Sequence, residues 1–368
     1  MKSAFSQFKR IVVYRIGSLG DTLVALPAFH LVRQVFPEAR ITLLTNVPVN
    51  AKAAPMEGIL GNTNLYDDIL RYPTSLRSVS RLLDLRKTLA AGRYDCLIYL
   101  TEPKGGILTS IRDRIFFALC GIPRIIGIPY SGRKLRPVQL PDSERFASET
   151  MRVLECVRGL GPVDLRDPKW WDLQLTNEET GEAEAVLRNH AISGPFLAAS
   201  LGSKIQPNDW EQHNWMRLAE CLAADFPGLS LVLLGAAEER ERSEQLLGIW
   251  RGPKANLCGA TSPRCSAAIL RGAATMVCHD SGPMHLAATM GVPCVAIFSA
   301  RNPPGVWYPR GDGHTVLYHR TPCWGCKLTM CVEQKKACIL SISVEEVHAA
   351  VRQQLARRGI HAGTGGGR

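Results

Sequence analysis

Along most of the chain, short apolar runs alternate with longer segments in which apolar residues recur every three or four positions. Short apolar runs are typical of buried parallel strands, and the longer spacing is typical of amphipathic helices. In the first half, the predicted strands are residues 11–15, 41–45, 94–100 and 124–128. The predicted helices are residues 22–36, 75–91, 107–119 and 149–160. This alternation predicts an α/β domain with a parallel sheet.

The second half repeats the alternation. Its predicted strands are residues 196–200, 230–234, 275–278 and 292–298, and its predicted helices are residues 213–225, 237–250 and 262–271. Residues 161–176 contain two prolines and no periodicity, which predicts a linker. We therefore expect two doubly wound, Rossmann-like domains, residues 1–160 and 177–342. A capping box, Ser343-x-x-Glu346, opens a last helix, so residues 343–368 are expected to form a C-terminal helix and a flexible tail.

Composition narrows the class of protein and of partner. With 368 residues, 46% hydrophobic and 21% charged, the chain can bury two cores and has the composition of a soluble globular enzyme. It has no apolar run of membrane-spanning length and no signal peptide, so we expect a cytoplasmic protein. The net charge of +11 favours an anionic partner. Nucleic-acid-binding motifs are lacking, which leaves an acidic glycolipid or peripheral contact with an anionic membrane face.

Between the last two predicted strands lies a turn with the features of an anion site. Asp280 or Ser281 can cap the following helix, Gly282 allows close approach of a ligand, and Pro283 suits the first helical turn. Amide groups at such a helix start bind phosphate. Any strand–helix–strand unit needs a capped helix and a glycine turn. However, His285 on the first turn is unusual for a core helix, and its imidazole can donate to a phosphate oxygen.

The first predicted strand also runs into a glycine turn, Gly17-Ser-Leu-Gly20-Asp21. A dinucleotide-binding fold would need a third glycine here and an acidic residue after the second strand. The chain has Thr45-Asn46 at that second position, which disfavours a nicotinamide cofactor. Asp21 is expected to cap the following helix. Serine or threonine would cap equally well, so capping does not explain a carboxylate.

Two segments resemble the signatures of one enzyme family. Residues 280–287, DSGPMHLA, followed by Gly-Val-Pro at 291–293, resemble the nucleotide-sugar motif of family-9 glycosyltransferases, the lipopolysaccharide heptosyltransferase family. Residues 15–21, RIGSLGD, followed by ALPA at 25–28, resemble the family's other signature. The resemblance covers about residues 10–351. It implies the GT-B architecture, in which two Rossmann-like domains face a cleft, with the acceptor in the first domain and the nucleotide sugar in the second.

The resemblance also implies roles for individual residues. In the family, the aspartate at the position of Asp21 is the proposed general base, and the turn Asp280-Ser-Gly-Pro283 with His285 binds the donor. A basic residue stands two positions before a tryptophan in the family. Here Asn208 takes that position before Trp210, which is a departure from the pattern, and we expect Lys204 to supply the charge.

One acidic residue remains to be assigned on the donor side. Residues 234–238, LGAAE, resemble the turn that holds the ribose hydroxyls in the family. We assign this role to Glu238 rather than Glu239. Both residues are also suited to the first turn of a helix, where the helix dipole favours acids.

Basic residues are densest in the loop 130–146 and in the segments before it. The loop carries Arg133, Lys134, Arg136 and Arg145, and nearby stand Lys104, Arg112, Arg114 and Arg124. Such a group is either a solvated surface or a site for an anionic acceptor. Because the family binds its acceptor in this half, we expect Arg133, Lys134 and Arg136 to bind the acceptor.

Four cysteines lie within sixteen residues, at Cys323, Cys326, Cys331 and Cys338. Such a cluster can hold zinc or an iron–sulfur cluster, but the spacing lacks the paired C-x₂-C pattern of a zinc ribbon. We therefore expect no catalytic cofactor and leave a structural metal at these cysteines as an alternative to a purely structural role.

These features predict an inverting glycosyltransferase. We expect transfer of a sugar, a heptose in the family, from a nucleoside diphosphate, ADP in the family, to a hydroxyl of the lipopolysaccharide core or another surface glycan. No Asp-x-Asp occurs to hold a divalent cation, which favours a metal-independent reaction. Two alternatives stay open: a nucleotide-sugar epimerase of the same architecture, and a non-catalytic nucleotide-sugar-binding protein.

Overall fold

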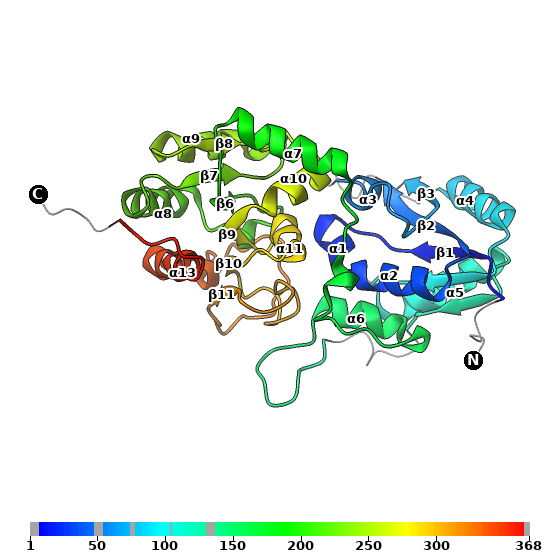
Figure 1. Cartoon of the computed structure of the whole chain (residues 1–368). Helices are drawn as coiled ribbons and strands as arrows, with labels where there is room; N and C mark the ends of the chain where they lie inside the picture. Colours follow the sequence, from blue (N-terminus) through cyan, green and yellow to red (C-terminus); the bar gives the residue numbers. More distant parts are fainter. Residues whose placement is uncertain (1–6, 48–53, 74–77, 104, 130–136, 364–368) are drawn as a thin grey trace, which may run out of the picture. The chain divides into compact units, whose positions relative to one another are not determined.

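The computed structural model describes residues 7–47, 54–73, 78–103, 105–129 and 137–363. The chain divides into two compact units, Met1–Gln174 and Leu175–Arg368 (Figure 1). The division falls within the segment 161–176. The short 3₁₀ helices η2 (Arg158–Leu160) and η3 (Pro168–Trp171) belong to the first unit. Each unit is described by itself below.

The first unit is built on a five-stranded parallel sheet with the order β3-β2-β1-β4-β5. The central strand β1 pairs with β2 and β4, and its residues Ile11, Val12 and Val13 are fully buried. The strands are β1 (Arg10–Tyr14), β2 (Arg40–Val47), β3 (Asp68–Pro73), β4 (Cys96–Tyr99) and β5 (Arg124–Ile126). The helices are α1 (Leu19–Val24), α2 (Leu26–Val35), α3 (Met56–Leu60), α4 (Val79–Gly92), α5 (Gly106–Leu119) and α6 (Glu149–Cys156).

Three features of this unit differ from the sequence prediction. The single helix expected over residues 22–36 is two helices, separated at Ala25. Pro27 stands in the first turn of α2, where its missing N–H removes a bond that a continuous helix would need. The helix expected over residues 149–160 ends at Cys156 and continues as η2. Strand β3 and helix α3 were not predicted, because β3 is a half-buried edge strand of mixed composition and α3 is one short turn.

The second unit is built on a six-stranded parallel sheet with the order β11-β10-β9-β6-β7-β8. Its strands are β6 (Phe196–Ser200), β7 (Ser230–Leu233), β8 (Lys254–Asn256), β9 (Ala273–His279), β10 (Cys294–Phe298) and β11 (Thr315–Tyr318). Its helices are α7 (Asn177–Asn189), α8 (Gln212–Asp225), α9 (Arg240–Ile249), α10 (Pro263–Leu270), α11 (Gly282–Thr289), α12 (Ala337–Leu340) and α13 (Val344–Ala356), with the short 3₁₀ helices η4 (Gln206–Asn208) and η5 (Ala237–Glu239).

Four elements of the second unit were not predicted: α7, β8, β11 and α12. Helix α7 has few apolar residues, so its sequence shows little periodicity. Tertiary and capping contacts hold it instead. Thr176 and Glu179 form a capping box, and Glu179 pairs with Arg264 on α10. A helix whose stability depends on such contacts is difficult to predict from periodicity alone.

Helix α13 packs into the core of the second unit. Val347, Val351 and Leu355 on this helix are fully buried and belong to the same apolar cluster as Trp210 and Trp215. The indole of Trp210 donates to the carbonyl of Ile342, just before the helix. The expected C-terminal helix therefore belongs to the core of this unit.

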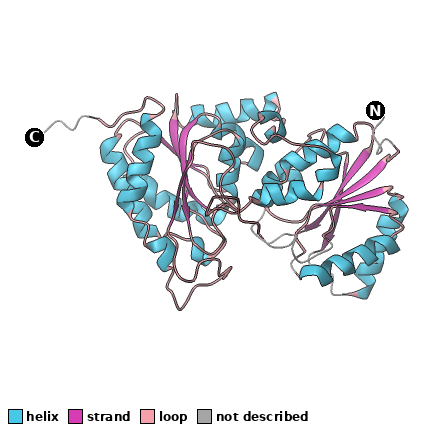
Figure 2. Cartoon of the chain, turned by 90° about the horizontal axis from the view of Figure 1, so that it is seen from below, coloured by secondary structure: helices cyan, strands magenta, loops and turns pink. Residues whose placement is uncertain are grey.

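Helices cover both faces of each sheet (Figure 2). The predicted fold class, two doubly wound α/β domains, is confirmed. In each sheet the strand order reverses beside the first strand, between β1 and β4 and between β6 and β9. Open parallel sheets bind ligands at such points. Within the described residues, no helix is both long and apolar enough to cross a bilayer.

Candidate active site

In the first unit, Asp21 lies at the reversal point beside β1. The N-cap of α1 is Ser18, and Asp21 is the third residue of the helix. Asp21 Oδ2 accepts hydrogen bonds from the backbone N–H of Ser18 at 2.8 Å and from its hydroxyl at 3.1 Å. The expectation that Asp21 is the N-cap is therefore wrong. The helix starts three residues earlier than expected, and Asp21 reaches back to its N-cap, Ser18, as in a capping box.

The turn that lets Asp21 reach back depends on Gly17. This glycine has φ of +139°, a conformation that other residues rarely adopt. A Cβ on Gly17 would lie 2.3 Å from Cβ of Asp21 and 2.7 Å from its Oδ2. Any larger residue at position 17 would therefore displace the carboxylate.

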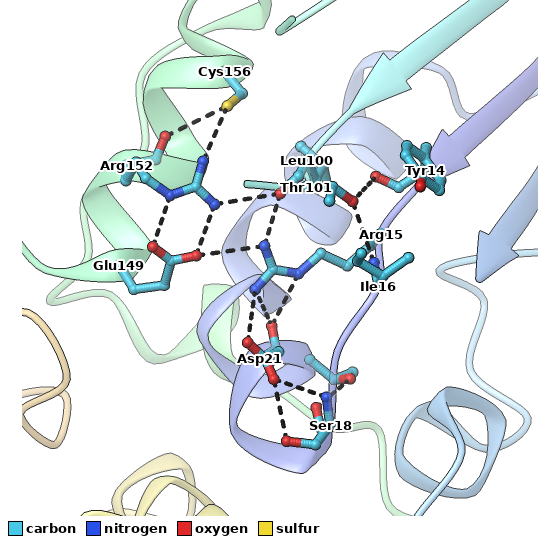
Figure 3. A network of polar contacts seen from close by, with 11 residues as sticks. Tyr14, Arg15, Ile16, Ser18, Asp21, Leu100, Thr101, Glu149, Arg152 and Cys156 are labelled. Carbon is cyan, nitrogen blue, oxygen red and sulfur yellow. Dashed lines mark hydrogen bonds and ion pairs between the residues drawn. The ribbon is translucent and has the colours of Figure 1, made fainter. Parts of the chain in front are cut away.

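A buried guanidinium holds the other side of Asp21 (Figure 3). Arg15 is almost fully buried and donates to the backbone carbonyls of Leu100 and Asp21, each at 2.7 Å. Its Nη1 also lies 3.5 Å from the buried carboxylate of Glu149, which Arg152 binds through two bonds of 2.7 Å. In the sequence, Arg15 appeared only as the first residue of the motif at residues 15–21, and no role was assigned to it. Sequence reasoning missed Glu149 and Arg152, because their α6 segment shows no motif.

The two oxygens of Asp21 have different surroundings. Oδ2 is engaged by Ser18, whereas Oδ1 lies 3.9 Å from Arg15 Nη2, beyond hydrogen-bond distance. The side chain is 35% exposed, although the guanidinium behind it is buried. Asp21 therefore presents a partly exposed carboxylate that Ser18 holds through Oδ2, while Arg15 holds the backbone carbonyl of the residue.

In the second unit, the predicted anion turn lies at the end of β9 beside the reversal point. Ser281 is the N-cap of α11, and Gly282 and Pro283 are its first two residues. The hydroxyl oxygen of Ser281 is buried and has no hydrogen-bond partner in the described residues. His285 is buried in the first turn, with its ring edge-on to Trp307 at 6.0 Å between centroids. The helix start thus combines amide groups with an unsatisfied buried hydroxyl, as an anion site would require.

His279, which sequence reasoning missed, lies just before this turn and contacts the loop after β6. His279 is fully buried at the end of β9. Its Nε2 accepts from the backbone N–H of Trp210 at 3.1 Å, so the ring proton is on Nδ1, which faces the carbonyl of Gly202 at 3.4 Å. Burial lowers the pKa of His279 to about 4, so the ring is neutral at neutral pH. His279 therefore fixes the loop after β6 against the end of β9.

Asn208, the departure from the family pattern, lies in the same loop and is buried. Its Nδ2 donates to the carbonyl of Asp280 at 3.4 Å, and its Oδ1 accepts from the hydroxyl of Ser299. A neutral amide thus joins the loop to the anion turn. Lys204, which we expected to replace the missing charge, is exposed on this loop, and its charge partly opposes the burial that raises the pKa of Glu239.

The acidic residue inside the turn after β7 is Glu239. Burial raises the pKa of its carboxyl group, which accepts from the backbone N–H of Ala236 at 3.3 Å. Its oxygens lie where a Cβ on Gly202 or Gly235 would be, at 1.6 and 1.9 Å. Glu238, the residue chosen from the sequence, is exposed. The structure thus favours Glu239 over Glu238 as the acid near the loop after β6.

The proposed acceptor residues Arg133, Lys134 and Arg136 lie outside the described residues. Of the other basic residues expected nearby, Arg112 pairs with the adjacent Asp113 at 2.6 Å, and Arg124 is exposed at the start of β5.

The four clustered cysteines line one cavity of about 310 Å³ in the second unit, and all are free thiols: Cys323, Cys326, Cys331 and Cys338. The sulfur of Cys331 accepts from the backbone N–H of Lys336 at 3.4 Å. In the part of the chain that the structure describes, no three Cys, His, Asp or Glu side chains are grouped closely enough to hold a metal ion. The cysteines share a cavity, but they do not converge on one point.

The family model described as glycosyltransferase family 9 (heptosyltransferase) matches residues 82–337, more than half of the chain. The chain belongs to this family. It is a glycosyltransferase of the heptosyltransferase class, as its two motifs predict.

Individual relatives agree with this family and with the fold. Lipopolysaccharide heptosyltransferase 2 of Escherichia coli K12 is 24% identical over 316 residues, which are 80% of this chain and 84% of the relative. The solved glycosyl transferase family 9 protein from Veillonella parvula has a TM-score of 0.71 at 20% identity, covering 95% of this chain and 98% of that one. The E. coli heptosyltransferase WaaC, solved with ADP-2-deoxy-2-fluoro heptose, has a TM-score of 0.60 at 15% identity, covering 94% and 99%.

Proposed function

We propose that this family-9 glycosyltransferase transfers a heptose from ADP-heptose to a hydroxyl of a lipopolysaccharide core or related surface glycan, with inversion and without a metal ion. The observation that carries the proposal is the form of Asp21. It is a fixed, partly exposed carboxylate at the reversal point of the first sheet, with one oxygen not engaged by Ser18. The second sheet has an anion turn at its own reversal point.

In this mechanism, Asp21 Oδ1 takes the proton of the acceptor hydroxyl. The hydroxyl oxygen then attacks the anomeric carbon of the donor, and the bond from that carbon to the diphosphate breaks with its electron pair on ADP. A single displacement inverts the configuration through an oxocarbenium-like transition state. Ser18 holds Oδ2 of the carboxylate and Arg15 holds the backbone carbonyl of the same residue, so the base is already positioned for the proton transfer.

The anion turn supplies the stabilisation of the leaving group. The first-turn amides of α11, the hydroxyl of Ser281 and the imidazole of His285 can donate to a diphosphate, and Lys204 adds a positive charge. We assign to Glu239 the role of accepting hydrogen bonds from the ribose hydroxyls. These groups replace the cation that an Asp-x-Asp sequence would hold in a metal-dependent transferase.

The choice of substrates rests on the relatives. The solved WaaC carries an ADP-heptose analogue, and the E. coli K12 relative is named for lipopolysaccharide. We assign the acceptor to the first unit, with Arg133, Lys134 and Arg136 in the basic loop as its anion-binding residues. The family match favours a transferase over an epimerase. The same match favours a transferase over a protein that only binds nucleotide sugars, and Asn208 serves to join the loop after β6 to the anion turn.

The substitution Asp21→Asn tests the proposal. The asparagine oxygen still accepts the N–H of Ser18, but its amide cannot take a proton at neutral pH. General base catalysis is worth about 10²–10⁴-fold, so the transfer rate should fall by that factor while ADP affinity and thermal stability stay near wild type. Transfer to a purified core glycan can be followed by mass spectrometry, and ADP affinity by calorimetry.

The control is Ser18→Ala, which removes one bond to Oδ2 but keeps the carboxylate and the backbone N–H. It should retain most of the rate. If Asp21→Asn keeps more than about a tenth of the rate, the base lies elsewhere. NMR of the product should show an anomeric configuration opposite to that of the donor. Loss of transfer in EDTA that magnesium restores would contradict the metal-independent reaction.

A further inference from the structure

Helix α5 has an apolar outer face. Leu108, Ile111, Ile115 and Leu119 are spaced by three and four residues, which places them on one side of a helix. Their exposed fractions are 75, 50, 55 and 61%. The opposite side of α5 is the buried one, with Phe117 and with Asp113, which accepts from the hydroxyl of Tyr99 at 2.8 Å. A surface helix of a domain normally presents polar residues outward, so this face needs a partner.

Helix α4 extends this apolar face. Arg86 on α4 donates to the carbonyl of Leu119 at 2.9 Å, which places the end of α5 against the middle of α4 (Figure 1). Only Leu89 of α4 is buried. Of the twelve large hydrophobic side chains that are exposed in the described residues, seven lie on these two helices. We call them the α4–α5 patch: Val79, Leu82, Leu83, Leu108, Ile111, Ile115 and Leu119.

Cationic side chains accompany the patch. Helix α4 carries Arg81, Arg86 and Lys87, and α5 carries Arg114 as well as Arg112, which is paired with Asp113. Among the described side chains of the two helices, the exposed carboxylate is Asp84 alone, since Asp113 is buried. An apolar face with several Lys and Arg and few acids is the composition of helices that lie in the interface of an anionic bilayer.

We propose that the α4–α5 patch is a docking surface for an anionic phospholipid bilayer. The leucine and isoleucine side chains enter the boundary between headgroups and acyl chains, and the arginine and lysine side chains contact lipid phosphates. The charge of the patch argues against a second copy of this chain as the partner, because two copies would bring cations against cations. The inference goes beyond the transfer reaction, since docking depends on none of the residues placed in catalysis.

Flotation of the full-length protein with lipid vesicles tests this inference. Wild type should float with vesicles of phosphatidylglycerol and phosphatidylethanolamine and stay behind with vesicles of phosphatidylcholine. The double variant Ile111→Gln/Ile115→Gln should lower the partition coefficient at least about tenfold, because it removes two apolar side chains from the lipid boundary. High salt should weaken binding as well, because the cationic contribution is screened.

The matched control is Val138→Gln/Met151→Gln, which replaces two exposed apolar side chains of the same unit outside the patch. It should float like wild type, and both double variants should melt at the wild-type temperature, because all four side chains are exposed. Failure of wild type to float with anionic vesicles, or equal flotation of the two double variants, overturns the proposal. It is also overturned if sedimentation shows a dimer that Ile111→Gln/Ile115→Gln dissociates, since the patch would then bind a second copy.

Discussion

The two reversal points of this protein stand at equivalent positions of two doubly wound sheets, yet they are built from different chemistry. In the first unit, a network of buried charges, with Arg15 between Glu149 and Asp21, holds a carboxylate. In the second unit, the side chains that join the loop after β6 to the end of β9 and to the turn are the neutral His279 and Asn208, which do so by hydrogen bonds.

The difference follows from what each point has to do in the proposed reaction. A carboxylate that acts as a base must be held in position, and the hydrogen bonds from Ser18 to its Oδ2 and from Arg15 to the backbone carbonyl of Asp21 do this. A turn that binds a diphosphate needs its amide groups free of competing anions. Neutral partners can hold such a turn without adding a carboxylate that would repel the ligand. In the proposed reaction, each sheet thus sets where its site lies, and the residues around the reversal point differ in charge between the two sites.

The largest expected effect concerns His279, the neutral residue that joins the loop after β6 to the end of β9 in the second unit. The pKa of His279 is about 4 in the folded state and about 6.5 in an unfolded chain. Between these values the unfolded chain binds more protons, so stability rises with pH and is lost as pH falls from 6.5 to 4. The difference corresponds to about 3 kcal/mol. In His279→Gln, the side-chain amide does not titrate. The free energy of unfolding should therefore change less with pH between 4 and 6.5 than it does in wild type.

Urea denaturation at a series of pH values measures the slope. Wild type and His279→Gln should differ by a constant above pH 7 and converge as the pH falls toward 4. Asp209 titrates below this range, since Arg242 lowers the pKa of its carboxyl group despite the opposing effect of burial. Equal slopes in the two proteins would show that His279 is not the titrating group.

Two glycine substitutions, one at each reversal point, should affect the transfer rate and the ADP affinity separately. Gly17→Ala displaces the carboxylate of Asp21, so it should lower the transfer rate by about a hundredfold and leave ADP affinity unchanged. Gly282→Val blocks the approach of phosphate to α11, so ADP affinity should fall by about a hundredfold, or about 2.7 kcal/mol. The control Gly248→Val places the same side chain in open space on α9 and should leave rate and affinity unchanged.

Calorimetric titration with ADP and steady-state kinetics give the readouts for this pair. If Gly17→Ala weakened ADP binding as much as Gly282→Val did, the division of labour between the two units would be wrong.

The smallest expected effect tests which of two neighbouring acids, Glu238 or Glu239, faces the ribose hydroxyls. Glu239→Gln removes the charge that we expect to face the ribose hydroxyls, and ADP should bind about tenfold more weakly, a loss of about 1.4 kcal/mol. Glu238→Gln changes an exposed acid of the same turn and should bind ADP as wild type does. The reverse order of affinities would restore the assignment made from the sequence.

The sequence alone was sufficient for eight of the eleven strands in the described residues and for the positions of the two turns. Strands β6 and β9 are buried along their whole length and β1 is buried over Ile11, Val12 and Val13, and burial on both faces leaves a signal that does not depend on the rest of the chain. Elements held mainly by tertiary contacts were missed. Helix α7 is polar but tied by Glu179 to Arg264, and β3 is a half-buried edge.

For the candidate site, the sequence determined which segments carry it, namely the glycine turns with Asp21 and with Gly282. Only the tertiary structure decided which side chains lie together in these segments and which are buried. It placed Ser18 rather than Asp21 at the start of α1, brought Glu149 to Arg15 across 134 positions, and left Glu238 exposed while Glu239 is partly buried. Turn chemistry is local and can be predicted from spacing. The partners of a buried charge come from distant segments, and their position depends on how the sheet and its helices pack.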